Sequence, residues 1–220
     1  MSDQNLESVK RVGSGLALIA FPLIFIILFA THPDLFNLSM VQDVNDRIEG
    51  FHGNDLLHFM HFVMLLCVPI LIVVALKLMG LLKRRGAWLG FIGCVMAVLG
   101  AIILAVDKTA LCLVPSAFDT LSEAQFALLV PGIEALYGYK GYLFVIWLLP
   151  LLPLGFVVQG IGLHISRLVP RWQSITIIIG ALLLANPDID LVSLVGSIIL
   201  TIGMLPLGIQ IIRNKIQDDN

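Results

Sequence analysis

Six long apolar runs, separated by short polar stretches, dominate the pattern of hydrophobic and polar residues along this chain. Most runs approach the roughly 20 residues that a helix needs to cross the hydrocarbon core of a bilayer. The pattern predicts an all-α fold, a polytopic membrane protein with one six-helix transmembrane domain over residues 1–220. The predicted helices span about 12–31, 55–76, 86–106, 142–165, 172–185 and 191–212. The fifth is the shortest.

Composition supports this prediction. Hydrophobic residues make up 59% of the chain and charged residues only 13%, and the mean hydropathy is +1.00. A soluble domain cannot bury so much apolar surface, so the expected partner is the lipid bilayer. The chain has no phosphate-binding glycine loop and no aromatic-basic surface, so nucleic acid is not an expected partner. Its three cysteines predict no disulfide framework.

The positive charges lie mainly on one side of this predicted topology. Lysine and arginine are enriched in cytoplasmic loops of membrane proteins. Of the 13 such residues, most fall in the terminal segments or in the links after the second and fourth runs: Lys10, Arg11, Lys77, Lys83, Arg84, Arg85, Arg167, Arg171, Arg213 and Lys215. Only Arg47, Lys108 and Lys140 fall on the other side. The sequence therefore predicts a multi-pass protein of the cell membrane with both termini in the cytoplasm.

Both long outer connections are predicted to contain short interfacial helices. The first is an amphipathic helix over Ser39 to Phe51. In the second connection, Thr120 and Glu123 have the spacing of a capping box that starts a helix continuing to Val130. Pro131-Gly132 is expected to end this helix before a second short piece. This apolar connection could act as a lid or admit a lipid.

The third run carries small residues about every four positions: Gly86, Gly90, Gly93, Ala97 and Ala101. Such spacing lets membrane helices approach closely. We therefore expect the third helix to pack tightly against a neighbour.

One stretch combines ionisable residues with a helical pattern. Asp55, His58 and His61 open the second run at i, i+3 and i+6, which places them within an arc of about 120°. Ionisable side chains in membrane helices are costly and usually face the protein interior or a wet cavity. Because the second and third runs are consecutive and antiparallel, we expect these residues to face Asp107, with Lys108 beside it.

Imidazole with carboxylate is a ligand set for transition metals. Asp55, His58, His61 and Asp107 are therefore the candidate metal ligands, and a transition-metal ion such as zinc is the candidate cofactor. In the alternative, the histidines only form hydrogen bonds with Asp107, loop carbonyls or interfacial water. Haem is disfavoured because His61 and His164 lie at opposite ends of their helices.

The lead functional hypothesis is a small integral membrane protein with an outer-facing His/Asp pocket that binds a metal ion or a lipid. One alternative is a non-catalytic structural or accessory membrane subunit. Another is a membrane-embedded hydrolase, with Asp107 or Glu134 as base, or a proton- or cation-coupled carrier. No HExxH or GxSxG motif is present, and the sequence leaves open whether the protein is an enzyme and how it oligomerises.

The segment Arg167-Leu168-Val169-Pro170-Arg171-Trp172, followed by an apolar helix containing Gly180, resembles a turn in a known family. The family comprises small six-helix bacterial and archaeal membrane proteins of unknown function. The entry to the first helix, Arg11-Val12-x-x-Gly15, is also similar. The resemblance implies six membrane helices and assigns no functional residue.

Overall fold

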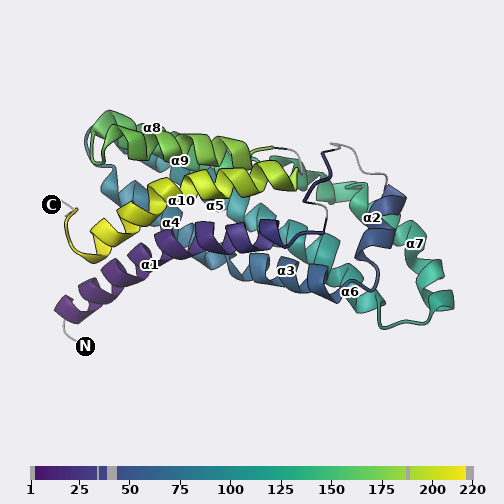
Figure 1. Ribbon diagram of the computed structural model, residues 1–220. Helices are drawn as coiled ribbons and strands as arrows, with labels where there is room; N and C mark the ends of the chain where they lie inside the picture. Colours follow the sequence, from purple (N-terminus) through teal and green to yellow (C-terminus); the bar gives the residue numbers. More distant parts are fainter. Residues whose placement is uncertain (1–2, 34, 39–43, 187–188, 217–220) are drawn as a thin grey trace.

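The computed structural model describes residues 3–33, 35–38, 44–186 and 189–216, and this part of the chain is helical without any strand. The all-α prediction is therefore confirmed. Figure 1 shows an elongated bundle with the N- and C-terminal ends together at one end, which we call the terminal end. The bundle consists of α1 Asp3–Ala30, α4 Val68–Leu81, α5 Ala87–Lys108, α8 Leu151–Ser166, α9 Arg171–Leu184 and α10 Asp190–Ile212.

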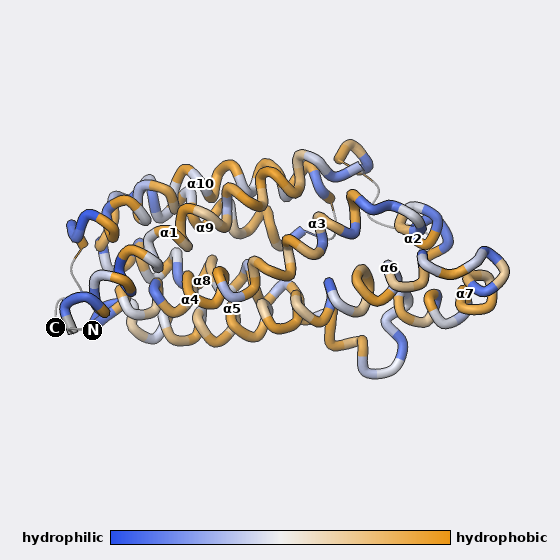
Figure 2. Tube along the Cα trace, turned by 90° about the horizontal axis from the view of Figure 1, so that it is seen from below, coloured by the Kyte–Doolittle hydropathy of each residue, from blue (hydrophilic) through white to orange (hydrophobic). Residues whose placement is uncertain are grey.

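The opposite end of the molecule, the cap end, carries shorter elements (Figure 1). They are α2 Val44–Phe51, the π-helix η1 Thr109–Leu113, α6 Val114–Phe118, α7 Glu123–Tyr137 and the 3₁₀ helix η2 Gly141–Leu148. The helix α3 Asp55–Leu66 starts at this end and runs into the bundle toward α4 (Figure 1). We call α2, η1, α6 and α7 the cap. In Figure 2 the middle of the bundle is mostly hydrophobic, and hydrophilic stretches gather toward the two ends.

Five helical stretches are long and apolar enough to cross a membrane: Gln4–Ala30, Asp55–Leu81, Ala87–Phe118, Gly141–Ser166 and Asp190–Ile212. Such helices are those of a membrane-spanning protein that contacts lipid. The fifth predicted helix, over 172–185, corresponds to α9, which has 14 residues and at 1.5 Å per residue spans about 21 Å. The described part of the chain therefore has five candidate membrane spans and one shorter apolar helix.

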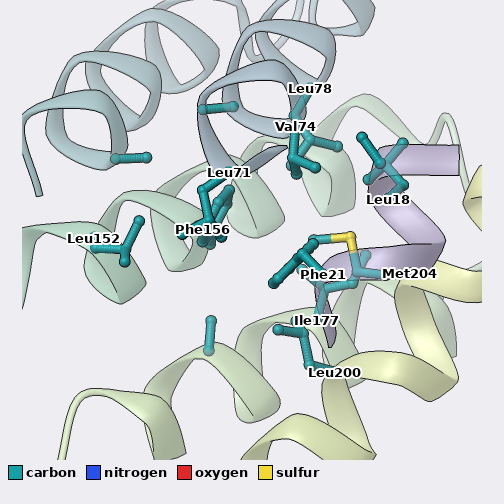
Figure 3. Packing of buried hydrophobic residues seen from close by; sticks show 14 of the residues in the cluster. Leu18, Phe21, Leu71, Val74, Leu78, Leu152, Phe156, Ile177, Leu200 and Met204 are labelled. Atoms are coloured by element: carbon teal, nitrogen blue, oxygen red, sulfur yellow. The ribbon is translucent and has the colours of Figure 1, made fainter. Parts of the chain in front are cut away.

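The bundle core is made of interlocking apolar side chains. Phe21 and Phe156 stack with their ring centroids 5.6 Å apart, and Leu71, Leu200 and Met204 are fully buried around them (Figure 3). Lipid tails are as apolar as leucine, so helix association in a membrane depends on close packing more than on the hydrophobic effect. The arrangement of the bundle therefore rests on the fit of these side chains.

Glycines make that fit possible where backbones meet. A Cβ on Gly155 of α8 would lie 2.5 Å from the Gly93 oxygen of α5. A Cβ on Gly208 of α10 would lie 2.6 Å from the Gly15 oxygen of α1. Gly180 of α9 meets α10 in the same way. The predicted close packing of the third run is thus confirmed at Gly93.

Two boundaries differ from the prediction, at the ends of the third helix and of α7, and the fourth helix differs only in the type of helix at its start. The third helix does not end near Val106 but continues through η1 and α6 to Phe118. Pro131 does not end α7, which runs uninterrupted through it. The fourth helix begins as 3₁₀ structure: Pro150 has no N–H to donate to the Ile146 carbonyl, and the Leu149 N–H donates to it instead at 2.8 Å.

The caps and interfacial elements also differ in detail. Asn54 caps α3 through its side chain, as the sequence allowed. The capping box of α7 is formed by Ser122 and Gln125, so the assignment to Thr120 and Glu123 was wrong. The predicted amphipathic helix over Ser39 to Phe51 corresponds to α2, and its first five positions lie outside the described residues.

The cap has a small hydrophobic cluster of its own, separate from the bundle core. Ile48 of α2, Cys112 of η1 and Phe126, Ile133 and Tyr137 of α7 belong to it. This cluster holds α7 and α2 against the extension of α5. It thereby covers the first turns of α3, where the predicted polar site lies.

Candidate functional site

Asp119, directly after α6, brings two histidines together under the cap. His52 Nδ1 lies 2.7 Å from one carboxylate oxygen of Asp119, and His58 Nε2 lies 2.8 Å from the other. His52 stands between α2 and α3, and His58 stands in the first turns of α3. One carboxylate therefore joins three segments of the cap end. We call these three residues the Asp119 network.

The network fixes which ring nitrogen of His58 carries the proton. An ionised carboxylate only accepts hydrogen bonds, so the Nε2–H of His58 donates to Asp119 and a neutral ring leaves Nδ1 as an acceptor. This Nδ1 is buried and has no hydrogen-bond partner among the described residues. His58 is only 8% exposed. A buried, oriented acceptor of this kind is costly unless something donates to it.

A small cavity of about 10 Å³ adjoins the network, which is roughly the space for one water molecule. His52, His58, Asp119 and Tyr137 supply its polar lining, and the other walls are apolar side chains from α2, α6 and α7. Burial raises the pKa of the Tyr137 phenol, so this group stays a neutral hydroxyl. The cavity thus combines a few polar groups with apolar walls, in a space that fits a single water molecule.

Aromatic contacts hold the rings of His52, His58 and His61 in place. The His52 ring stacks on Phe126 of α7 with a centroid separation of 3.8 Å. Phe51 contacts both the His58 ring and the His61 ring, at 6.2 and 5.3 Å between centroids. The position of the Asp119 network therefore depends on α7 and on the end of α2.

His61 belongs to a second polar group, where α1, α3, α5 and α10 meet. Its Nδ1–H donates to the Leu57 carbonyl at 2.8 Å, and its ring lies edge-on to His32, 6.0 Å away. His32 Nδ1 in turn lies 2.7 Å from a carboxylate oxygen of Asp190 at the start of α10. Lys108 is an electrostatic neighbour of His61.

The four predicted metal ligands do not converge on one point. Asp55 is exposed on the first turn of α3. Asp107 is buried and pairs with Lys108, with 2.9 Å between Oδ2 and Nζ, while His58 and His61 have the separate partners described above. Over the described ranges, no group of three or more His, Cys, Asp or Glu side chains could hold a metal ion. The metal site therefore stays a prediction.

Sequence reasoning missed Asp119 as the partner of His58. Asp119 lies 12 positions after Asp107 in a connection that was expected to leave the helix. The intervening chain contains a π turn and Pro115, which cannot donate to the Leu111 carbonyl. Extrapolation along a regular helix therefore could not place Asp119. The available signal was that Asp119 is the first acidic residue of the connection that follows Asp107 and Lys108.

Comparison with known proteins adds no assignment: no family model matches the chain, and neither a curated protein nor a solved structure matches it. The resemblance of the Arg167–Trp172 turn to a six-helix family stays a prediction.

Proposed function

We propose that this chain is a six-pass integral membrane protein with both termini in the cytoplasm, and that it binds a small ligand at its outer end. Five long apolar helices support the crossing, and the two ends of the chain lie together (Figure 1). An even number of crossings then requires α9 to be the sixth. The bias of lysine and arginine toward the terminal end supports the cytoplasmic orientation.

Single exposed cysteines test this topology, because Cys67, Cys94 and Cys112 are all buried. Ala124→Cys in α7 should react with a membrane-impermeant maleimide in intact cells. Arg85→Cys, in the link after α4, should react only after the cells are permeabilised. The reverse pattern would overturn the orientation. Labelling of both cysteines in intact cells would show that positions 85 and 124 lie on the same side of the membrane, and it would overturn the predicted odd number of crossings between them.

The ligand site is the Asp119 network, and its central group is His58. The observation that carries this assignment is the buried Nδ1 acceptor beside a cavity with apolar walls. Asp119 orients the ring and holds its proton on Nε2, so Nδ1 presents a lone pair to a hydrogen-bond donor. The ligand class that fits is a small neutral hydrogen-bond donor of about the size of a water molecule.

Nitrogen NMR spectra of isotope-labelled histidine, recorded on protein in membranes, test this assignment. We expect one histidine, absent in His58→Gln, to have a protonated Nε2 and an unprotonated Nδ1 that is shifted by a hydrogen-bond donor. Asp55→Asn is the matched control because Asp55 lies one turn earlier and is exposed, and it should leave this signal unchanged. A protonated Nδ1 on His58 would contradict the proposal.

The metal hypothesis has its own test, elemental analysis of the purified protein without a histidine tag. Near-stoichiometric zinc, iron or copper that is lost in a His58→Ala/His61→Ala double variant would establish the predicted metal site. In that case the partner of His58 would be a metal ion and not a hydrogen-bond donor.

A further inference from the structure

The 3₁₀ helix η2 presents a row of aromatic side chains outward. A 3₁₀ helix has three residues per turn, so side chains three positions apart lie in line. Leu143 and Ile146 pack against the cap's cluster, while Phe144 and Trp147 form an exposed line and Tyr142 stands beside them. The exposed fractions are 60% for Phe144, 73% for Trp147 and 92% for Tyr142. We call these three residues the aromatic strip.

The aromatic strip carries two hydrogen-bond donors, the Trp147 indole N–H and the Tyr142 hydroxyl. Neither is bonded to another side chain or carbonyl in the part of the chain that the structure describes. Aromatic rings with one polar atom favour the boundary between hydrocarbon and water, where the ring is in an apolar medium and the donor meets polar groups.

The packing of α5 against α8 sets the level of the strip along the bundle. Gly100 of α5 meets the backbone of Leu152 of α8. From this crossing, Asp107 lies seven helical residues farther toward the cap, about 10 Å. Trp147 lies five residues before Leu152 along partly 3₁₀ chain, also about 10 Å. Trp147 and Asp107 are therefore at the same level.

The polar groups at the outer ends of α1, α5 and α10 lie at the same level along the bundle. Lys108 follows Asp107 and is an electrostatic neighbour of His61. His32, which is a neighbour of His61 as well, pairs with Asp190 at the start of α10. Counting back along α5 from Asp107 to Ala87 gives about 30 Å, the thickness of a bilayer core. Arg84 and Arg85 lie just beyond that point. One bilayer core thus fits between the basic link and the level of the strip.

We infer that Tyr142, Phe144 and Trp147 form a lipid-contacting surface at the outer membrane interface, where the indole N–H and the phenol O–H donate to the ester and phosphate oxygens of lipid headgroups. This inference rests on the proposed membrane crossing and goes beyond it by assigning the depth and the lipid contact. It places Asp119 and the cap outside the hydrocarbon, with His58 at the level of the headgroups.

Fluorescence quenching by brominated lipids measures the depth of a tryptophan directly. The double variant Trp88→Phe/Trp172→Phe leaves Trp147 alone, and both replaced residues are exposed. In vesicles containing phosphatidylcholine brominated near the headgroup, we expect a larger loss of Trp147 fluorescence than with bromines near the chain ends. In a variant lacking all three native tryptophans, Leu99→Trp should show the opposite order, because Leu99 is exposed mid-helix on α5.

Two results would overturn the inference: Trp147 fluorescence that neither lipid quenches, or stronger quenching by the chain-end bromines. The Leu99→Trp reporter distinguishes a failure of the headgroup contact from a failure of the membrane crossing. If that reporter is quenched by the chain-end bromines and Trp147 is not quenched, the protein crosses the membrane and only the headgroup contact fails. If neither reporter is quenched, the crossing fails as well.

Discussion

The bundle and the cap are held together by different interactions. In the bundle, glycines bring helix backbones into contact, and buried amides donate to backbone carbonyls of neighbouring helices. Gln159 Nε2, for example, lies 2.8 Å from the Ala75 oxygen and 3.3 Å from the Gly90 oxygen. The cap is held by its small hydrophobic cluster, by the capping box of α7, by stacked rings and by the hydrogen bonds of His52 and His58 to Asp119. The bundle depends on backbone fit, whereas the cap combines its own hydrophobic cluster with hydrogen bonds between polar side chains.

The largest predicted effect separates glycines of the two regions. Gly155→Ala would drive a Cβ into the Gly93 carbonyl and the Ala97 backbone N, so we expect a loss of about 3 kcal/mol or more in unfolding free energy. Gly132→Ala in α7 has no atom within 4 Å of the new Cβ, and should stabilise the helix by up to about 1 kcal/mol. Unfolding in mixed detergent micelles measures both. Equal destabilisation would show that the cap is packed like the bundle.

A smaller effect is expected at the start of α7. Ser122→Ala removes the side-chain acceptor of the capping box and should cost about 1 kcal/mol, seen as faster proteolysis within α7. Thr120→Ala is the control, because the Thr120 hydroxyl donates only to the Ala117 carbonyl. If Thr120→Ala exposes α7 to protease and Ser122→Ala does not, the capping box starts at Thr120 after all.

The smallest effect is expected for a buried polar group of the bundle. Gln159→Met loses two interhelical hydrogen bonds, each worth about 0.6 kcal/mol in membrane proteins. It also removes the Oε1 atom, which is buried without a partner in the described structure. The two changes oppose each other, so the net loss should stay within about 1 kcal/mol. A loss as large as that of Gly155→Ala would mean that polar side chains, and not only backbone fit, determine the bundle.

The same contrast explains what the sequence could predict. Apolar runs and the glycine spacing at Gly93 depend on local pattern, and both were recognised. The cap depends on long-range geometry: how many turns η1 and α6 add beyond Lys108, and where α7 then returns. Asp55 is exposed on α3, whereas His58 and His61 are both buried there. Their partners differ because Asp119 and His32 arrive from segments whose positions no periodicity encodes.

Hydrogen–deuterium exchange of Asp119→Asn in lipid nanodiscs tests most directly the claim that the Asp119 network holds the cap over the His58 site. We predict faster amide exchange in α2 and α7, with unchanged exchange in α8 and α9, because the variant weakens two hydrogen bonds of the cap and none of the bundle. Unchanged exchange in α2 and α7, or an equal increase throughout the bundle, would contradict the account.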